Sequence, residues 1–180
     1  RALGVGDGHQ AVVYDGAGLF SAARVWWPFR LTGKTDIAVL DGGFAKWQAE
    51  GRAIEDMAPV IRDRHMTVQR PAHLSTDVTH VASASKLGNW QIVDARSPAR
   101  FKGEEPEKRP GLRSGHIPSS KNVYYRDLLK SDGTMKDLSA LRVIFEGAGI
   151  DMAKPVVTTC GSGVTAAILS LALERLGHPM

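Results

Sequence analysis

The sequence has 180 residues, enough for one large domain or two small ones, and its 43% hydrophobic and 23% charged residues are ordinary for a globular protein. No apolar run approaches the roughly 18 residues that a membrane-spanning helix needs. We therefore expect no membrane partner. The single cysteine excludes an internal disulfide, so we expect a reducing, cytoplasmic location. The net charge of +4 comes from basic residues spread along the chain, which does not indicate nucleic-acid binding, and no His/Cys/Asp cluster has metal-ligand spacing.

The N-terminal part of the chain is predicted to form a strand–helix–strand unit. Two aliphatic runs that end in Asp-Gly are typical of buried parallel strands. They are residues 11–15 (AVVYD) and 37–43 (IAVLDGG). The segment 19–33 between them is expected to be a helix that Ser21 caps and Gly33 ends, with a kink at Pro28. Residues 44–51 add one or two helical turns.

A linker is predicted at residues 56–75, where charge rises, hydrophobic periodicity fades, and Pro59 and Pro71 appear. The sequence therefore predicts a first domain within 1–55 and a second within 76–180.

In the second domain, helical and strand patterns alternate, which indicates the α/β class. Helices are expected at 78–88, 137–150 and 164–177, and strands at 90–97 and 155–159. A charged loop with several Gly and Pro residues, 98–123, comes directly after the first of these strands.

An internal repeat relates the two parts of the chain. When Cys160 is set on Asp15, CGSG overlays DGAG, and each copy reads as strand, glycine turn, helix, glycine. Only the second copy has a thiol, so only it can perform thiol chemistry. The second copy stops at Met180 before a strand equivalent to 37–43, so we expect the sequence to be an internal piece of a longer two-repeat protein.

The stretch TTCGSGVTAA, residues 158–167, places Cys160 between a strand and a helix. Backbone N–H groups at a helix start have no partner in the helix, and together with the helix dipole they favour a thiolate, lowering the pKa of the cysteine below about 8.5. The alternative is an inert, packed cysteine. The flanking Gly161, Ser162 and Gly163 argue against a core position.

These residues carry a resemblance to a known family. CGSGVTA resembles the active-site loop of the 3-mercaptopyruvate sulfurtransferases, the two-domain branch of the rhodanese superfamily. VDARSPARFKGEEPEKRPGLRSGHIPSSKNV, YDGAGLFSAARVWW and VLDGGFAKW resemble further stretches of that family, with Ser119 where it usually has glycine. We expect this last difference to have no effect.

The resemblance implies a rhodanese-like fold, a parallel sheet with helices on both faces, repeated in tandem. Residues 1–55 would be the C-terminal part of the first, inactive domain. Residues 76–180 would be the catalytic domain without its last strand and helix.

The resemblance also implies an activity: sulfur moves from 3-mercaptopyruvate to Cys160 as a persulfide, then to a thiol or cyanide, with pyruvate released and no cofactor or metal. A thioredoxin-like reductant is a further expected partner. Ser162 would assist proton transfer, and Arg100 and Arg109 would bind the carboxylate and ketone of the substrate. The loop around the sulfur would bind the donor through Gly161, Gly163, Val164 and Thr165. His116 is expected to be structural.

Three alternatives stay open at this point. A thiosulfate sulfurtransferase typically has basic residues directly after the cysteine, where this chain has uncharged Gly161 and Ser162. A phosphatase of the same fold needs arginine six residues after the cysteine, where this chain has Ala166. A non-catalytic rhodanese-like binding module is the third alternative, since the family also uses active-site groups that would lie upstream of Arg1.

Overall fold

The structure, a computed structural model, describes residues 3–107 and 109–178. The chain divides into two compact units, each with its own parallel sheet. The first unit comprises the described residues up to Ser75 together with Ser131–Thr134, and the second comprises Thr76–Lys130 and the described residues from Met135 onward. Within the described ranges, no helix combines the length and hydropathy that a membrane crossing requires.

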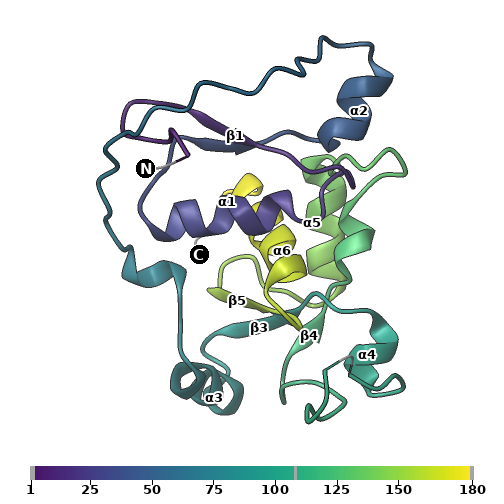
Figure 1. Ribbon diagram of the computed structural model, residues 1–180. Helices are drawn as coiled ribbons and strands as arrows, with labels where there is room; N and C mark the ends of the chain where they lie inside the picture. The colour runs from purple at the N-terminus through teal and green to yellow at the C-terminus, as the bar shows by residue number, and fades with distance from the viewer. Residues whose placement is uncertain (1–2, 108, 179–180) are drawn as a thin grey trace. The chain divides into compact units, whose positions relative to one another are not determined.

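The first unit confirms the predicted strand–helix–strand order (Figure 1). Its elements are β1 (Ala11–Val13), α1 (Ala22–Leu31), β2 (Ile37–Val39), α2 (Gly43–Ala49) and the 3₁₀ helix η1 (Ala72–Leu74). β1 and β2 pair in parallel, with Ala11 opposite Ile37. One face of α1 buries small residues and an aromatic ring: Ala22, Ala23 and Trp26.

The expected cap of α1 is wrong. Ser21 precedes the helix, but its side chain makes no capping hydrogen bond. The carboxylate of Asp15 instead accepts hydrogen bonds from the backbone N–H groups of Ser21 and Ala22 at 2.7 and 2.8 Å. An ionised carboxylate has two oxygens and a full charge, so it can serve several helix-start N–H groups where a hydroxyl serves one.

Residues 52–71 contain no helix or strand and belong to the first unit, to which their last part is hydrogen-bonded. The backbone N–H and hydroxyl of Thr67 donate to the Asp7 carboxylate, at 3.1 and 2.7 Å. The N–H of Gln69 donates to the carbonyl of Thr32 at 2.9 Å. That residues 56–75 join two domains stays a prediction.

The second unit is a three-stranded parallel sheet with helices on both faces (Figure 1). Its elements are α3 (Val78–Leu87), β3 (Gln91–Asp94), α4 (Pro98–Lys102), β4 (Lys121–Asn122), the 3₁₀ helix η2 (Tyr125–Leu128), α5 (Leu138–Gly147), β5 (Val156–Thr159) and α6 (Val164–Arg175). The strand order is β4-β3-β5, and α3 lies on the opposite side of the sheet from α5 and α6. All four residues of β3 are buried, as a central strand covered on both faces requires.

Local signals explain where the helices of this unit begin. The carboxylates of Asp77 and Asp137 accept hydrogen bonds from the third N–H groups of α3 and α5. α4 and β4 lie inside the segment that we expected to be a loop. Ser97 caps α4, Pro98 opens it and Gly103 ends it in the left-handed conformation.

The chain segments that leave the three parallel strands meet at one edge of the sheet. The N–H of Ala95 donates to the carbonyl of Thr159 at 2.9 Å, and the N–H of Val123 donates to the carbonyl of Asp94 at 3.0 Å. The segments after β3, β4 and β5 therefore converge, and a parallel α/β sheet places its ligand sites at this carboxyl edge.

Candidate active site

Cys160 occupies the turn between β5 and α6. Gly163 directly precedes α6 with a φ of 81°, a left-handed conformation that glycine adopts without strain. This turn brings the N–H of Gly163 to 3.0 Å from the Cys160 sulfur. The sulfur therefore lies at the N-terminal end of a 12-residue helix, where the helix dipole favours negative charge.

Two opposing effects set the pKa of Cys160. Burial raises it, since a partly desolvated thiolate is disfavoured. Hydrogen bonds from the Thr165 hydroxyl and from three backbone N–H groups lower it, and their sum prevails, so the pKa lies below the ordinary value of a thiol. The three N–H groups belong to Ala166, Ser162 and Gly163.

The predicted loop residues have different exposures. Gly161 and Ser162 are exposed, whereas Gly163, Val164 and Thr165 are half-buried. The Ser162 hydroxyl forms no hydrogen bond with any described residue, although its N–H contributes to the sulfur environment. The sulfur is thus held on the helix side, and the opposite side of the loop faces solvent.

The structure places Arg100 beside this loop. A Cβ atom added to Gly161 would lie 3.0 Å from Nη2 of Arg100, so the guanidinium group reaches the residue that follows the cysteine. Arg100 comes from α4, and its side chain is 19% exposed. A basic group therefore lies against the sulfur loop without being part of it.

A buried network of ion pairs, which the sequence reasoning missed, holds this basic group. Arg96 donates to both carboxylate oxygens of Asp94 and, at 2.8 Å, to the carbonyl of Gly115. Glu107 accepts from Arg96 at 2.6 Å and from Arg100 at 2.5 Å. The signal was present in the sequence as DAR followed by the acidic run of 104–107, but a charged loop does not reveal which of its charges are buried.

Arg109 is not brought to the loop by any observed contact. Its side chain is exposed and, in the part of the chain that the structure describes, forms no hydrogen bond or ion pair. Its role therefore stays a prediction. Nδ1 of His116 lies 2.6 Å from the Phe101 carbonyl, and the His116 ring stacks on the Phe101 ring at 3.8 Å between centroids, an arrangement that suits the expected structural role.

The equivalent turn in the first unit is filled by its own side chain. The Asp15 carboxylate accepts hydrogen bonds from four backbone N–H groups, which outweigh the effect of burial and lower its pKa. These groups belong to Ala17, Phe20, Ser21 and Ala22, at 2.7–2.9 Å. The repeat thus builds the same cradle of N–H groups twice, around a carboxylate in the first unit and a sulfur in the second.

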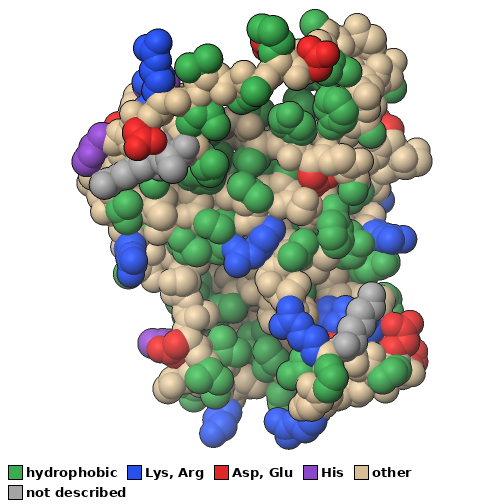
Figure 2. Space-filling view, in the orientation of Figure 1, with side chains coloured by type: hydrophobic (Ala, Val, Ile, Leu, Met, Phe, Trp, Pro, Cys, Tyr) green, Lys and Arg blue, Asp and Glu red, His purple; other side chains and the backbone are tan. Residues whose placement is uncertain are grey.

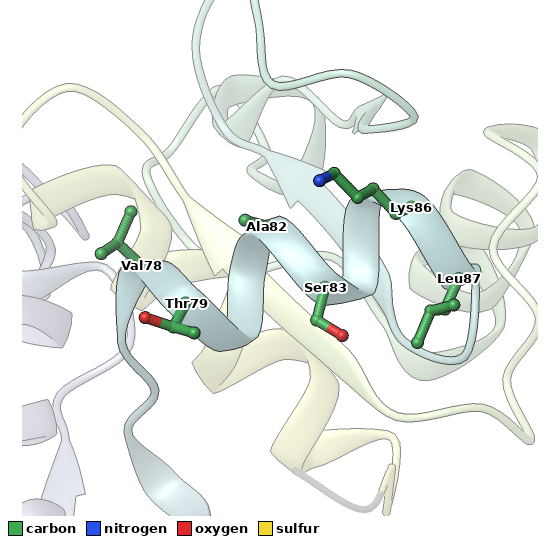
Figure 3. Close-up of a pocket in the computed structure, with 6 residues that line it drawn as sticks. All are labelled: Val78, Thr79, Ala82, Ser83, Lys86 and Leu87. Carbon is green, nitrogen blue, oxygen red and sulfur yellow. The ribbon is translucent and has the colours of Figure 1, made fainter.

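A shallow pocket of about 570 Å³ lies elsewhere, on the outer face of α3 (Figure 3). Its lining residues are Val78, Thr79, Ala82, Ser83, Lys86 and Leu87, and none of them belongs to the Cys160 site. On the face shown in Figure 2, Lys and Arg side chains are distributed among hydrophobic and neutral ones instead of forming one continuous patch. The described residues contain no group of three His, Cys, Asp or Glu side chains arranged to hold a metal ion.

Comparisons with known proteins agree with this geometry. The sequence profile of the rhodanese-like domain matches residues 77–180. The chain is 41% identical over 179 residues to the 3-mercaptopyruvate sulfurtransferase of Escherichia coli K12, covering 99% of this chain and 63% of that protein. It is 37% identical over 183 residues to the thiosulfate sulfurtransferase of Bos taurus, covering 61% of it. The chain therefore spans about three fifths of the length of these relatives.

A solved structure gives the same picture. The crystal structure of SseA from Escherichia coli, described as having the rhodanese fold and as a 3-mercaptopyruvate sulfurtransferase, superposes with a TM-score of 0.88 at 38% identity. The match covers 99% of this chain and 66% of that one.

Proposed function

Because this chain belongs to the family of rhodanese-like domains, we propose that it moves sulfur from 3-mercaptopyruvate to a thiol or cyanide through a persulfide on Cys160. The expected α/β rhodanese-like fold and the resemblance to 3-mercaptopyruvate sulfurtransferases are both confirmed. The observation that supports the activity most directly is the sulfur environment, in which N–H groups and the Thr165 hydroxyl favour the thiolate.

The first half-reaction begins with attack of the Cys160 thiolate on the sulfur of 3-mercaptopyruvate. A sulfur–sulfur bond forms, the carbon–sulfur bond breaks, and its electron pair leaves as the enolate of pyruvate. The enolate then takes the proton that the donor thiol gives up, so the products are pyruvate and a persulfide anion on Cys160. Ser162 has an exposed hydroxyl that is free to pass this proton, which supports the role proposed for it.

The loop supports this chemistry electrostatically. A persulfide places its negative charge one atom further from the cysteine, so the N–H groups of Ser162, Gly163 and Ala166 and the N-terminus of α6 can stabilise it. The donor lies in the same region in this proposal, with Gly161, Gly163, Val164 and Thr165 as its boundary.

Arg100 and Arg109 are proposed to bind the carboxylate and ketone of the donor. A guanidinium group can give a carboxylate two parallel hydrogen bonds. The position of Arg100 beside Gly161 supports its role. For Arg109 the support is its place in the matching motif alone.

The second half-reaction transfers the outer sulfur to an acceptor. We propose a small thiol or cyanide, with a thioredoxin-like protein as a further acceptor, and a cytoplasmic location for the reaction. Thiosulfate is the second candidate donor, because relatives from Arabidopsis thaliana are named thiosulfate/3-mercaptopyruvate sulfurtransferases. Uncharged Gly161 and Ser162 favour the keto-acid over a doubly charged inorganic anion. A non-catalytic binding module stays the alternative outside enzymes.

The decisive experiment pairs Cys160→Ser with a comparison of both donors. Wild-type protein incubated with 3-mercaptopyruvate should gain about 32 Da, the mass of one sulfur atom, by mass spectrometry. Cys160→Ser should gain nothing and release no pyruvate, and thiosulfate should load the wild type more slowly. Pyruvate release by Cys160→Ser at the wild-type rate would contradict the persulfide, and faster loading from thiosulfate would reverse the choice of donor.

A further inference from the structure

Glu107 is a buried carboxylate placed between two guanidinium groups. Its side chain is only 5% exposed. One oxygen accepts a hydrogen bond from Nη1 of Arg96 at 2.6 Å and the other accepts one from Nη2 of Arg100 at 2.5 Å. Without this carboxylate, two like charges would face each other with little solvent between them.

The two arginines are anchored differently. Arg96 is fixed to the end of β3 by three hydrogen bonds to the Asp94 carboxylate, which is itself buried at 2% exposure. Among the described residues, the Arg100 side chain has a single hydrogen-bond partner, Glu107. The position of the Arg100 guanidinium is therefore set by Glu107, through Arg96 and ultimately through the central strand.

The same nitrogen of Arg100 that bonds to Glu107 lies against the sulfur loop at Gly161. Nε of Arg100 is buried and has no hydrogen-bond partner. A buried donor without a partner is unfavourable, and an anion at the loop can satisfy it. Glu107 thus holds the Arg100 guanidinium through Nη2, while Nε remains without a hydrogen-bond partner.

We propose that Glu107 is a positioning residue that holds the Arg100 guanidinium at the Cys160 loop so that it can bind the carboxylate of the sulfur donor. This inference rests on the proposed sulfur transfer for the identity of the donor. The hydrogen bond from Arg100 lowers the pKa of Glu107, burial acts against it, and the bond from Arg96 adds to the lowering, so the carboxylate stays charged at neutral pH. Glu107 does not touch the donor, and it acts through Arg100.

The test is a double-mutant cycle with Glu107→Gln and Arg100→Gln. Each variant should raise the KM for 3-mercaptopyruvate roughly tenfold, about the loss of one hydrogen bond to a charged group, with a smaller change in kcat. The double variant should be no worse than Arg100→Gln alone, since Glu107 has no other route to the donor. Glu105→Gln, an exposed glutamate of the same segment, is the matched control and should match the wild type.

Two readouts separate positioning from folding. Alkylation of Cys160 by iodoacetamide should be unchanged in Glu107→Gln, because Glu107 is not among the groups that lower the cysteine pKa. Urea unfolding reports any loss of stability. The inference would be overturned if the two substitutions multiplied their increases in KM in the double variant, or if Glu107→Gln left the KM unchanged.

A failure of the proposed function gives a different pattern. If the wild type forms no persulfide with either donor, sulfur transfer is wrong, but affinity for pyruvate still tests the positioning role. Calorimetric titration of pyruvate into Cys160→Ser and into Cys160→Ser/Glu107→Gln should then show about tenfold weaker binding in the second. Equal affinities would reject the role of Glu107 irrespective of the reaction.

Discussion

Thr165 sits where a single hydroxyl changes the chemistry of Cys160. Its hydroxyl is the side-chain group that lowers the pKa of Cys160, whereas the other groups that lower it are backbone N–H groups, which only proline would remove. The hydroxyl stabilises the thiolate and leaves the thiol unaffected, so it lowers the pKa.

We therefore expect Thr165→Val, which keeps the shape but loses the donor, to raise the Cys160 pKa. The rate of alkylation by iodoacetamide, followed against pH, should show its midpoint at higher pH than in the wild type. Thr165→Ser keeps the hydroxyl and should stay close to the wild type. A Thr165→Val profile that overlays the wild type would mean that backbone N–H groups alone set the thiolate.

At the residue scale, the sequence predicts the sulfur loop well because its signals are local. A lone cysteine between glycines, after an aliphatic run and before a helical one, determines its own surroundings. Arg100 was predicted only through the resemblance. Glu107 and Arg96 were missed because their importance comes from burial and from partners up to 19 residues apart, which composition does not reveal.

Ser119 is a second residue whose structural consequence the sequence alone did not reveal. It was expected to have no effect, but it is the non-glycine residue with a positive φ, 64°, among those described. Serine tolerates this left-handed conformation less well than the glycine usual in the family. Its hydroxyl donates to the Ser85 carbonyl at 3.0 Å, which offsets part of the strain.

At the scale of elements, the start of α1 depends on one carboxylate. Asp15 accepts from four backbone N–H groups, and the fold holds its pKa below the ordinary value of 3.8. A depressed carboxyl pKa stabilises the fold above the unfolded-state pKa, and that stabilisation is lost as pH falls through the folded-state pKa.

Asp15→Ala should accordingly lower the free energy of unfolding by about 2 kcal/mol at pH 7, the upper end of the range for a lost helix cap. The difference between wild type and variant should shrink as the pH falls below about 4, where the Asp15 carboxylate of the unfolded chain begins to protonate, and it should be lost as the pH falls through the lower folded-state pKa. Urea unfolding at pH 7 and pH 3 measures the loss of unfolding free energy and its decrease at low pH. Asp36→Ala, an exposed aspartate of the same unit, should leave the stability unchanged at either pH; a constant Asp15→Ala difference across pH would exclude the charged cap.

The elements that the sequence predicted are short aliphatic runs closed by turn residues, or helical segments of at least ten residues. β1, β3, β5, α1, α3, α5 and α6 all lie where expected. The elements that it missed are short: β4 has two residues and α4 has five. The two-residue strand β4 is defined by its pairing with β3, which is a tertiary contact. Two residues are too few to show a hydrophobic periodicity, so the sequence does not predict this strand.

At the scale of the whole chain, the two units repeat one design with different outcomes. Each places a side chain at the end of a strand, inside the N–H groups of the next helix. In the first unit the Asp15 carboxylate already accepts hydrogen bonds from those N–H groups, and there is no thiol at that position. In the second unit the same groups are available to a thiolate or persulfide, which confines the proposed chemistry to Cys160.

An exposed segment late in the first unit gives a prediction about the whole chain. Every residue from 51 to 65 is exposed, and 52–65 contain no helix or strand. From His65 onward the backbone is tied down, since the His65 carbonyl accepts from the N–H of Asp7 at 2.9 Å. Proteases require an exposed, locally unfolded stretch, so the free part of this segment is the most susceptible.

Brief digestion with trypsin should therefore cut first after Arg52, Arg62 or Arg64 and release a C-terminal fragment that contains Cys160. Mass spectrometry of the first products identifies the site, and iodoacetamide labelling of the fragment shows whether the sulfur loop keeps its reactivity. A competing site, Arg113, is also exposed, whereas trypsin does not cut after Arg109 because Pro110 follows it. However, the segment of Arg113 is tethered by the buried Glu107 and by the hydrogen bond from Arg96 to Gly115. A first cut after Arg113 would show that the Glu107 network opens more readily than its burial and four-charge pairing imply.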